Sequence, residues 1–221
     1  MTTARATRIL GGLAAAGVVV GLAAAFLVAP RETTQGNVQR IMYLHVPAVW
    51  VAYLAFAVAG AASVVYLGRR AAGADRLAHA AAEVGALFLA VNIATGSIWG
   101  KPTWGTWWTW DARLTSVAVV FVVYVGYLML RRAADDPERG ARYAAVVAIL
   151  GALNIPLVHF SVYWWRTLHQ PPSVLRPGGG VTMPEAILAV LLVNLGALAL
   201  LAAYFIAKRV TILRAEAEAL A

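Results

Sequence analysis

The sequence contains no cysteine among its 221 residues. This absence excludes disulfides, thiolate catalysis, iron–sulfur ligation and covalent haem attachment through a Cys-x-x-Cys-His motif. Charged residues are scarce, at 13% of the chain, which argues against a soluble domain. The phosphate-binding motif Gly-x-x-x-x-Gly-Lys-Ser/Thr is also missing, so we do not expect the chain to hydrolyse nucleotides by itself.

Apolar residues, in contrast, are abundant: 62% of the chain is hydrophobic and the mean hydropathy is +0.74. Six apolar runs are long enough to cross a bilayer. They lie at about residues 9–29, 46–68, 77–99, 114–130, 143–164 and 184–207. We therefore expect an all-α polytopic membrane protein, with residues 1–221 forming a single domain of six transmembrane helices and residues 208–221 forming a tail.

The basic residues predict the orientation of these spans. If the N-terminus is cytoplasmic, twelve of the 18 Lys and Arg residues fall on the cytoplasmic side, in clusters such as Arg69-Arg70 and Arg131-Arg132. This bias follows the positive-inside rule, so it also explains the net charge of +8 without nucleic acid. We expect both termini and the tail in the cytoplasm.

Tryptophan is concentrated in one segment between the third and fourth runs. Five of the eight tryptophans occur between Trp99 and Trp110, and Asp111 follows. In the predicted topology, all eight tryptophans lie at or beyond the outer ends of spans. A simple interfacial belt would place tryptophan at both interfaces, so the asymmetry favours an aromatic platform for a large planar ligand, residues 99–111, over a belt.

The geometry of this platform depends on whether its second half is helical. If it is, then Trp104, Trp107, Trp108 and Asp111 share one face. Asp111 has two equally plausible interpretations: it is the N-cap of the fourth helix, or it orients a histidine ligand or borders the platform.

Two of the four histidines, His45 and His169, lie outside the membrane in this topology, beside tryptophan-rich segments. His45 is expected just before the second helix and His169 just after the fifth. Either one alone would be interpreted as an interfacial polar residue. Together they favour ligation of a haem iron from both faces.

The other two histidines are interpreted differently. His159 is expected within the fifth span, where we favour a structural hydrogen bond to Asn92 or Asn154 over transient ligation. His79 is expected at the cytoplasmic interface. Glu83, one turn further in, needs a partner, and His79 and Arg76 are the nearest possibilities along the chain.

Several motifs resemble one known family. The run from Trp99 to Ser116 is similar to the tryptophan-rich "WWD" signature of haem-handling proteins in cytochrome c maturation. The stretches 42–47, 154–161 and 164–170, together with the six spans, resemble the cytochrome c maturation protein C family, also called haem exporter protein C.

The resemblance implies a haem-transfer protein, not an enzyme, in the bacterial cytoplasmic membrane. Haem b would be held non-covalently at the periplasmic face, with His45 and His169 as axial ligands. The expected partners are the haem chaperone protein E, the ABC transporter proteins A and B, and the small protein D. We expect the remaining haem contacts from the platform and from outer-side cations: Trp104, Trp107, Trp108, Trp110, Asp111, Lys101, Arg113 and Arg166.

Three other functions are compatible with some of these features. The first is a permease subunit that moves haem across the bilayer, although the span interiors contain few strongly polar groups. The second is an enzyme that forms the covalent bond between haem and chaperone, for which no nucleophile or base pair is evident. The third is a quinol-linked b-type cytochrome, which usually needs histidines in facing spans.

Overall fold

The computed structural model describes residues 2–174 and 176–219. This part of the chain is built from long helices and contains no strand. The helices are α1 (Thr2–Ala23), α2 (Met42–Arg69), α3 (Ala72–Trp104), α4 (Ala112–Ala133), α5 (Pro137–Trp164) and α6 (Glu185–Ala219), with a π-helical turn η1 (Ala24–Val28) after α1 and a 3₁₀ turn η2 (Val38–Ile41) before α2.

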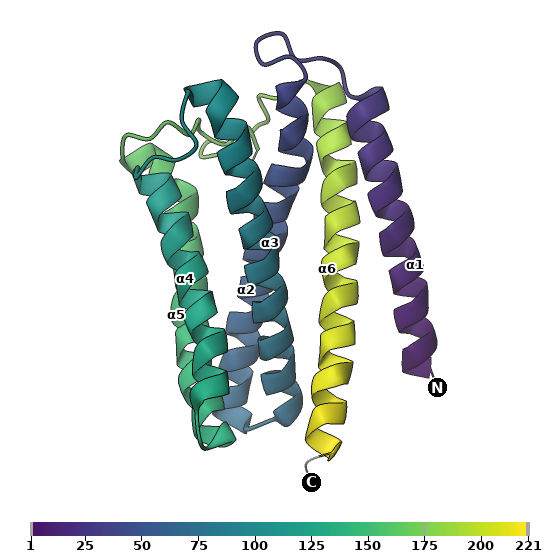
Figure 1. The fold of residues 1–221 in the computed structure, drawn as a ribbon, viewed down its shortest axis with the longest axis vertical. Helices are drawn as coiled ribbons and strands as arrows, with labels where there is room; N and C mark the ends of the chain where they lie inside the picture. The colour runs from purple at the N-terminus through teal and green to yellow at the C-terminus, as the bar shows by residue number, and fades with distance from the viewer. Residues whose placement is uncertain (1, 175, 220–221) are drawn as a thin grey trace.

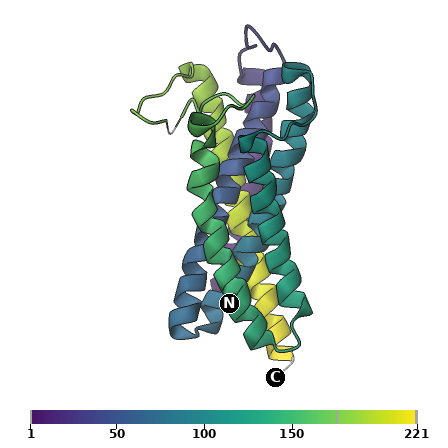
Figure 2. The ribbon, with the colours of Figure 1, turned by 90° about the vertical axis from the view of Figure 1, so that its left-hand side faces the viewer.

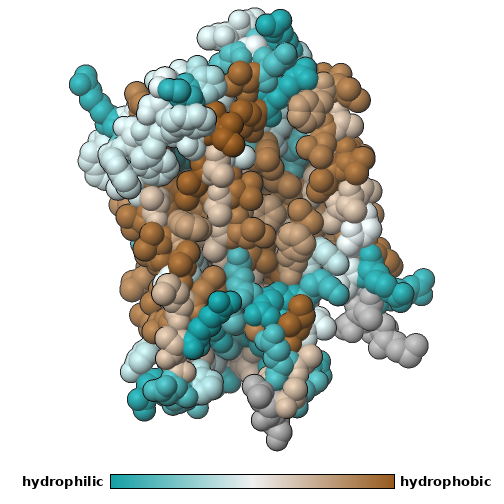
Figure 3. Space-filling view, viewed as in Figure 1, coloured by the Kyte–Doolittle hydropathy of each residue, from teal (hydrophilic) through white to brown (hydrophobic). Residues whose placement is uncertain are grey.

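Six helical segments are long and apolar enough to cross a membrane, which confirms the predicted polytopic all-α class. Figure 3 shows apolar side chains over the middle of the visible face and hydrophilic side chains gathered toward both ends. This pattern fits a bundle whose middle part contacts lipid and whose ends contact water.

The helices run side by side along the long axis of the molecule (Figures 1 and 2). Helices α2 and α3 pack together, α4 and α5 form a second pair beside them, and α6 joins α2 and α3 to the peripheral α1. Phe56 of α2 stacks on Tyr124 of α4 with 3.6 Å between ring centroids. The Tyr124 hydroxyl donates to the Ala148 carbonyl of α5 at 3.0 Å, so this polar group is satisfied inside the core.

Charged pairs join the helices near the end that holds both termini (Figure 1). Arg131 of α4 forms a bidentate pair with Asp75 of α3, at 2.6 and 2.8 Å. Glu83 of α3 lies 3.4 Å from His79, as predicted, and it also accepts a hydrogen bond from Arg209 of α6. The predicted alternative partner, Arg76, is not needed, because α6 supplies the arginine.

The termini lie at one end of the bundle, while the tryptophan-rich segment and the long loop between α5 and α6 lie at the other (Figure 1). This arrangement is the one that six spans require. The start of α2, which carries His45, lies at the same end as the loop after α5, which carries His169.

One local prediction was wrong, and the structure settles two details that the sequence left open. Helix α2 begins at Met42 and follows a 3₁₀ turn, so His45 lies in its first turn instead of before it, and Pro47 lies inside the helix. The apolar run of residues 184–207 is part of a longer helix: α6 continues to Ala219, so the described part of the tail is helical, and residues 220 and 221 lie outside the described part. Residues 105–111 are not helical.

The break at residue 105 has a clear local cause. Helix α3 ends at Trp104, and Gly105 follows with a φ of 79°, the left-handed conformation that glycine adopts most readily. The chain then runs without regular structure to Asp111, which caps α4. The helical face proposed for Trp104, Trp107, Trp108 and Asp111 therefore does not exist.

Candidate functional site

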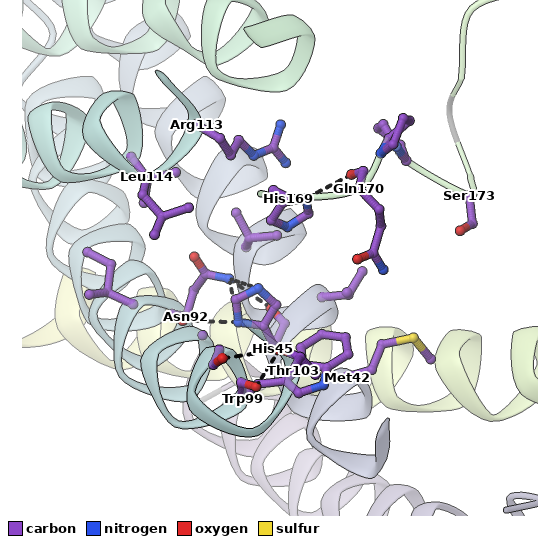
Figure 4. A pocket seen from close by; sticks show the side chains of 18 of the residues that line it. Met42, His45, Asn92, Trp99, Thr103, Arg113, Leu114, His169, Gln170 and Ser173 are labelled. Atoms are coloured by element: carbon purple, nitrogen blue, oxygen red, sulfur yellow. Dashed lines mark hydrogen bonds between the residues drawn. The ribbon is translucent and has the colours of Figure 1, made fainter. Parts of the chain in front are cut away.

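A pocket opens at the end of the bundle opposite the termini. Its walls come from α2, α3, α4 and α5, from the segment between α3 and α4 and from the loop after α5, with further residues from α6 and the loop after η1. His45 and His169, separated by more than half of the sequence, both line it (Figure 4). Its aromatic and polar lining residues include Gln35, His45, Trp50, Asn92, Trp99, Trp104, Trp108, Arg113, His159, His169 and Gln170.

His45 enters the pocket from the first turn of α2 and packs against α3. Its Nδ1 lies 3.0 Å from the backbone oxygen of Asn92 and 3.2 Å from the Thr95 hydroxyl. The indole of Trp99 meets the imidazole edge-on, with 5.6 Å between centroids. The ring is therefore held by α3 on the wall of the pocket.

His169 enters the pocket from the loop that follows α5. Its Nδ1 lies 2.8 Å from the Gln170 carbonyl oxygen, and the Trp104 indole lies 6.0 Å away, centroid to centroid. Burial, followed by the positive charge of Arg113, lowers the pKa of His169 to about 4. The imidazole is thus neutral at pH 7, the form in which histidine binds a metal ion.

Asp111 is the N-cap of α4, one of its two predicted roles, and it also contacts the loop after α5. Its Oδ1 accepts the backbone N–H of Leu114 at 2.9 Å, so it is the N-cap of α4. Its Oδ2 accepts from the Thr167 hydroxyl at 2.8 Å and from the Leu168 N–H at 3.0 Å. The same carboxylate therefore fastens the loop that carries His169 to the start of α4.

Of the three cations predicted near the ligand, only Arg113 lines the pocket. It is 9% exposed and donates from Nη1 to the carbonyls of Val158, at 2.7 Å, and His159, at 3.0 Å. Lys101 is exposed and donates to the Gly105 carbonyl. Arg166 is exposed as well, and neither of these two belongs to the lining.

The predicted tryptophan platform divides into two groups. Trp104 and Trp108 line the pocket, whereas Trp107 and Trp110 do not and are 56% and 77% exposed. Trp110 packs edge-on against Trp108, at 5.6 Å between centroids.

Sequence reasoning assigned no pocket role to several residues that line it. Trp50 is one of them, whereas Trp99, which also lines the pocket, belongs to the predicted platform. Gln35, from the loop after η1, accepts a hydrogen bond from the Trp99 indole at 2.8 Å. Asn92 lies beside His45, although its amide was predicted to pair with His159. A polar amide within an apolar run was the only sequence signal for Asn92, and nothing in the sequence pointed to Gln35.

His159 also lines the pocket, and its ring meets that of Phe160 edge-on at 5.0 Å. The other partner predicted for it, Asn154, donates to the Leu150 carbonyl of its own helix at 2.9 Å.

Comparison with known proteins identifies the relatives of this chain. A family model described as "Heme exporter protein C" matches residues 1–221. The chain belongs to the heme exporter protein C family. This confirms the resemblance drawn from the tryptophan and histidine motifs.

Individual members of the family are similar over most of the chain. "Heme exporter protein C" of Bradyrhizobium diazoefficiens is 48% identical over 175 residues, which is 78% of this chain and 66% of that protein. Its Escherichia coli K12 namesake is 47% identical over 165 residues, 72% of this chain and 66% of that protein. A "Putative cytochrome c biosynthesis ccmC-like mitochondrial protein" of Marchantia polymorpha is 40% identical over 154 residues, 70% of this chain and 65% of that protein. The chain thus aligns with about two thirds of the length of these relatives.

Proposed function

We propose that this protein binds haem b in the pocket, without a covalent bond, and passes it to a partner during cytochrome c maturation. The axial ligands in this proposal are His45 and His169. The single observation that carries it is that these two imidazoles, from the first turn of α2 and the loop after α5, line one pocket among tryptophans. The names of the related proteins, which refer to haem export and cytochrome c biosynthesis, support the same ligand.

The residues of the pocket fit the chemistry of haem. Two neutral imidazoles can occupy both axial positions of the iron, which suits a carrier because it leaves no open position for oxygen. The indoles of Trp50, Trp99, Trp104 and Trp108 offer apolar faces and edges to a porphyrin. The Arg113 guanidinium is the cation best placed for a propionate, since it lines the pocket. The chain has no cysteine, so the ligand remains free to leave.

The pocket end of the bundle is assigned to the periplasm. The opposite end carries both termini and the larger share of basic residues, among them Arg69, Arg70 and Arg132, which are exposed. The positive-inside rule places such an end in the cytoplasm. Haem would thus be bound at the outer face of the bacterial cytoplasmic membrane.

The proposed recipient is the haem chaperone protein E, with the ABC transporter proteins A and B and the small protein D as further partners. The exposed indoles of Trp107 and Trp110 lie next to the pocket along the chain and offer an apolar contact surface at its rim. In this proposal the protein is a carrier, not an enzyme, and promotes attachment of haem to the chaperone only by positioning it.

The alternative function, a permease subunit that passes haem through the bundle, is less well supported. Strongly polar groups within the spans make contacts inside the protein: Asn194 donates to carbonyls of Gly21 and Val190, and Glu83 pairs with His79 and Arg209. Asn194 and Glu83 thereby join helices together, which favours a structural role for them over lining a path for haem. Haem loading of oriented vesicles from one face or the other distinguishes the two functions.

The experiment that tests the proposal is purification in mild detergent after expression with haem supply. We expect a bis-histidine haem absorbance spectrum, lost in the His45→Ala/His169→Ala double variant. The matched control is His79→Gln, at the opposite end of α3, which should keep the spectrum. A double variant with an unchanged spectrum contradicts the assignment.

A further inference from the structure

Three residues of α3, Asn92, Thr95 and Gly96, surround the His45 imidazole with polar contacts and close packing. We propose that they form a cradle that fixes which ring nitrogen of His45 carries the hydrogen and which nitrogen faces the iron. The cradle residues are positioning residues, because they act through His45. This inference rests on the proposed function, in which His45 is an axial ligand.

The contacts of Nδ1 favour one tautomer. Nδ1 lies 3.0 Å from the Asn92 backbone oxygen and 3.2 Å from Thr95 Oγ1. The Thr95 hydroxyl donates its own hydrogen within α3, most closely to the Val91 carbonyl at 2.7 Å, so its oxygen meets the imidazole as an acceptor. Two acceptors beside Nδ1 stabilise the Nδ1–H form. The lone pair that binds a metal ion is then on Nε2.

The Asn92 side chain ties the backbone of α2 to α3 at the same point. Asn92 is 5% exposed, and its amide nitrogen donates to the His45 carbonyl oxygen at 3.0 Å. The same nitrogen lies 3.2 Å from Nδ1 and 3.3 Å from Nε2 of the ring. One amide hydrogen therefore fixes the main chain of the ligand residue. In the Nδ1–H form the other can donate only to Nε2, and iron bound at Nε2 would displace this hydrogen bond.

Gly96 provides the space that the ring occupies. A Cβ built at this position would lie 2.7 Å from His45 Cε1 and 3.3 Å from Nδ1, and the first of these distances is shorter than any real contact. A side chain at 96 would therefore push the imidazole out of its place on α3. The close approach of helix backbone to ring requires glycine here.

Together these contacts set the position of the His45 ring along α3, the orientation of the ring and its tautomer. Hydrogen bonding of the second ring nitrogen orients a histidine ligand and raises its basicity, and loss of such partners typically weakens metal binding by about 10- to 100-fold. The cradle is separate from the loop that carries His169, because all its members belong to α3.

The first test is made on the ligand-free protein with ¹⁵N-labelled histidine. Long-range ¹⁵N–¹H correlation spectra distinguish Nδ1–H from Nε2–H, and the His45 signal is assigned by its loss in His45→Gln. We expect the Nδ1–H form. A His45 protonated at Nε2 overturns the cradle, and this readout does not depend on haem.

The second test measures the rate of haem dissociation in matched pairs of variants. Gly96→Ala is compared with Gly126→Ala in α4, where an added Cβ meets nothing within 4 Å. Thr95→Val is compared with Thr211→Val in α6, whose hydroxyl makes the same bond to the carbonyl four residues earlier. We expect dissociation about tenfold faster in each cradle variant than in its control. Equal rates within both pairs overturn the inference.

The His45→Ala variant separates failure of the cradle from failure of the proposed function. If His45→Ala loses bis-histidine ligation while the cradle variants match their controls, His45 remains a ligand and the cradle is wrong. If His45→Ala keeps the wild-type spectrum, the ligand assignment itself fails, and the inference fails with it.

Discussion

Asp111 and Thr167 meet between the start of α4 and the loop after α5, where the threonine hydroxyl donates to the carboxylate at 2.8 Å. Thr167 Oγ1 also accepts the backbone N–H of His169 at 3.0 Å. A chain of hydrogen bonds therefore leads from the N-cap of α4 to one of the two proposed iron ligands. These hydrogen bonds connect the tryptophan-rich segment, which ends at Asp111, to His169.

Replacing Asp111 by alanine should weaken haem binding as well as the fold. Loss of an N-cap costs about 1 kcal/mol, and the loop that carries His169 loses two hydrogen bonds in addition. We expect a mixed high-spin and low-spin haem spectrum and faster haem loss. The measurement is the absorbance spectrum together with the thermal midpoint.

The matched control for this variant is Asp136→Ala. Asp136 caps α5 by accepting from the N–H groups of Glu138 and Arg139, but it lies outside the pocket. The Asp136→Ala variant should lower the thermal midpoint to a similar extent and leave the haem spectrum unchanged. Equal spectra for both variants would contradict the role of Asp111 in holding His169.

Haem retention should depend on pH through His169. Because burial and the charge of Arg113 lower the pKa of His169 to about 4, the imidazole stays neutral and able to bind iron from pH 8 down to about pH 5. Protons compete with iron only as the pH falls through about 4. Titration of the haem spectrum in the purified protein should therefore show no loss of haem above about pH 5, and loss at a more neutral pH would contradict this prediction.

Removing the positive charge at position 113 should shift the same titration upward. Without the arginine, the protonated form of His169 is less disfavoured, so its pKa moves toward the ordinary value and haem is lost at higher pH in Arg113→Gln. Arg166→Gln, an exposed change outside the pocket lining, is the control and should titrate like the wild type. An identical midpoint in Arg113→Gln would show that this charge does not act on His169.

The two groups of tryptophans should respond differently to substitution. Trp104→Ala removes an indole that lines the pocket next to His169, and it should lower haem occupancy severalfold. Trp110→Ala removes an indole that is 77% exposed and lies outside the lining, so haem occupancy should persist. If Trp110 contributes to partner docking, transfer to the purified haem chaperone slows. Pigment content measures haem occupancy, and an assay of haem transfer to the chaperone measures the effect on docking. Equal haem occupancy in the two variants would contradict a contact between Trp104 and haem.

The paired charges at the opposite end should affect stability without affecting haem. In Asp75→Asn, Arg131 loses its charged partner while its side chain is only 14% exposed. We expect destabilisation of about 2 kcal/mol and an unchanged haem spectrum. The control is Glu138→Gln, which breaks the more exposed pair with Arg142 and should cost less than about 0.5 kcal/mol. Thermal unfolding of both variants in detergent checks the difference, and equal stability would contradict a structural role for Asp75–Arg131.

The sequence predicted the helices well, because their signals are strong and repeated. Runs of about twenty apolar residues leave few alternatives in a bilayer, and all six spans are present. The details that the sequence did not predict lie at helix ends. The 3₁₀ turn before Met42 and the extension of α6 to Ala219 depend on packing between helices, which hydropathy does not report.

The site was predicted in outline but not in detail. His45, His169, Trp104, Trp108 and Arg113 line one pocket, and their binding of haem stays a prediction. The sequence did not separate these residues from Trp107, Trp110, Lys101 and Arg166. For Trp107 and Trp110 that requires knowing that Gly105 ends α3 and turns the chain. Gln35 and Asn92 were not assigned to the pocket because their partners, Trp99 and His45, lie 64 and 47 residues away along the chain.

The most direct measurement of the central claim is the electron paramagnetic resonance spectrum of the purified ferric protein. Ligation by both His45 and His169 predicts a low-spin six-coordinate signal in the wild type. The single variants His45→Gly and His169→Gly should each give a five-coordinate high-spin signal that reverts to low spin when imidazole is added. A wild-type low-spin signal that persists in either single variant, without added imidazole, would contradict the claim that these two residues share one iron.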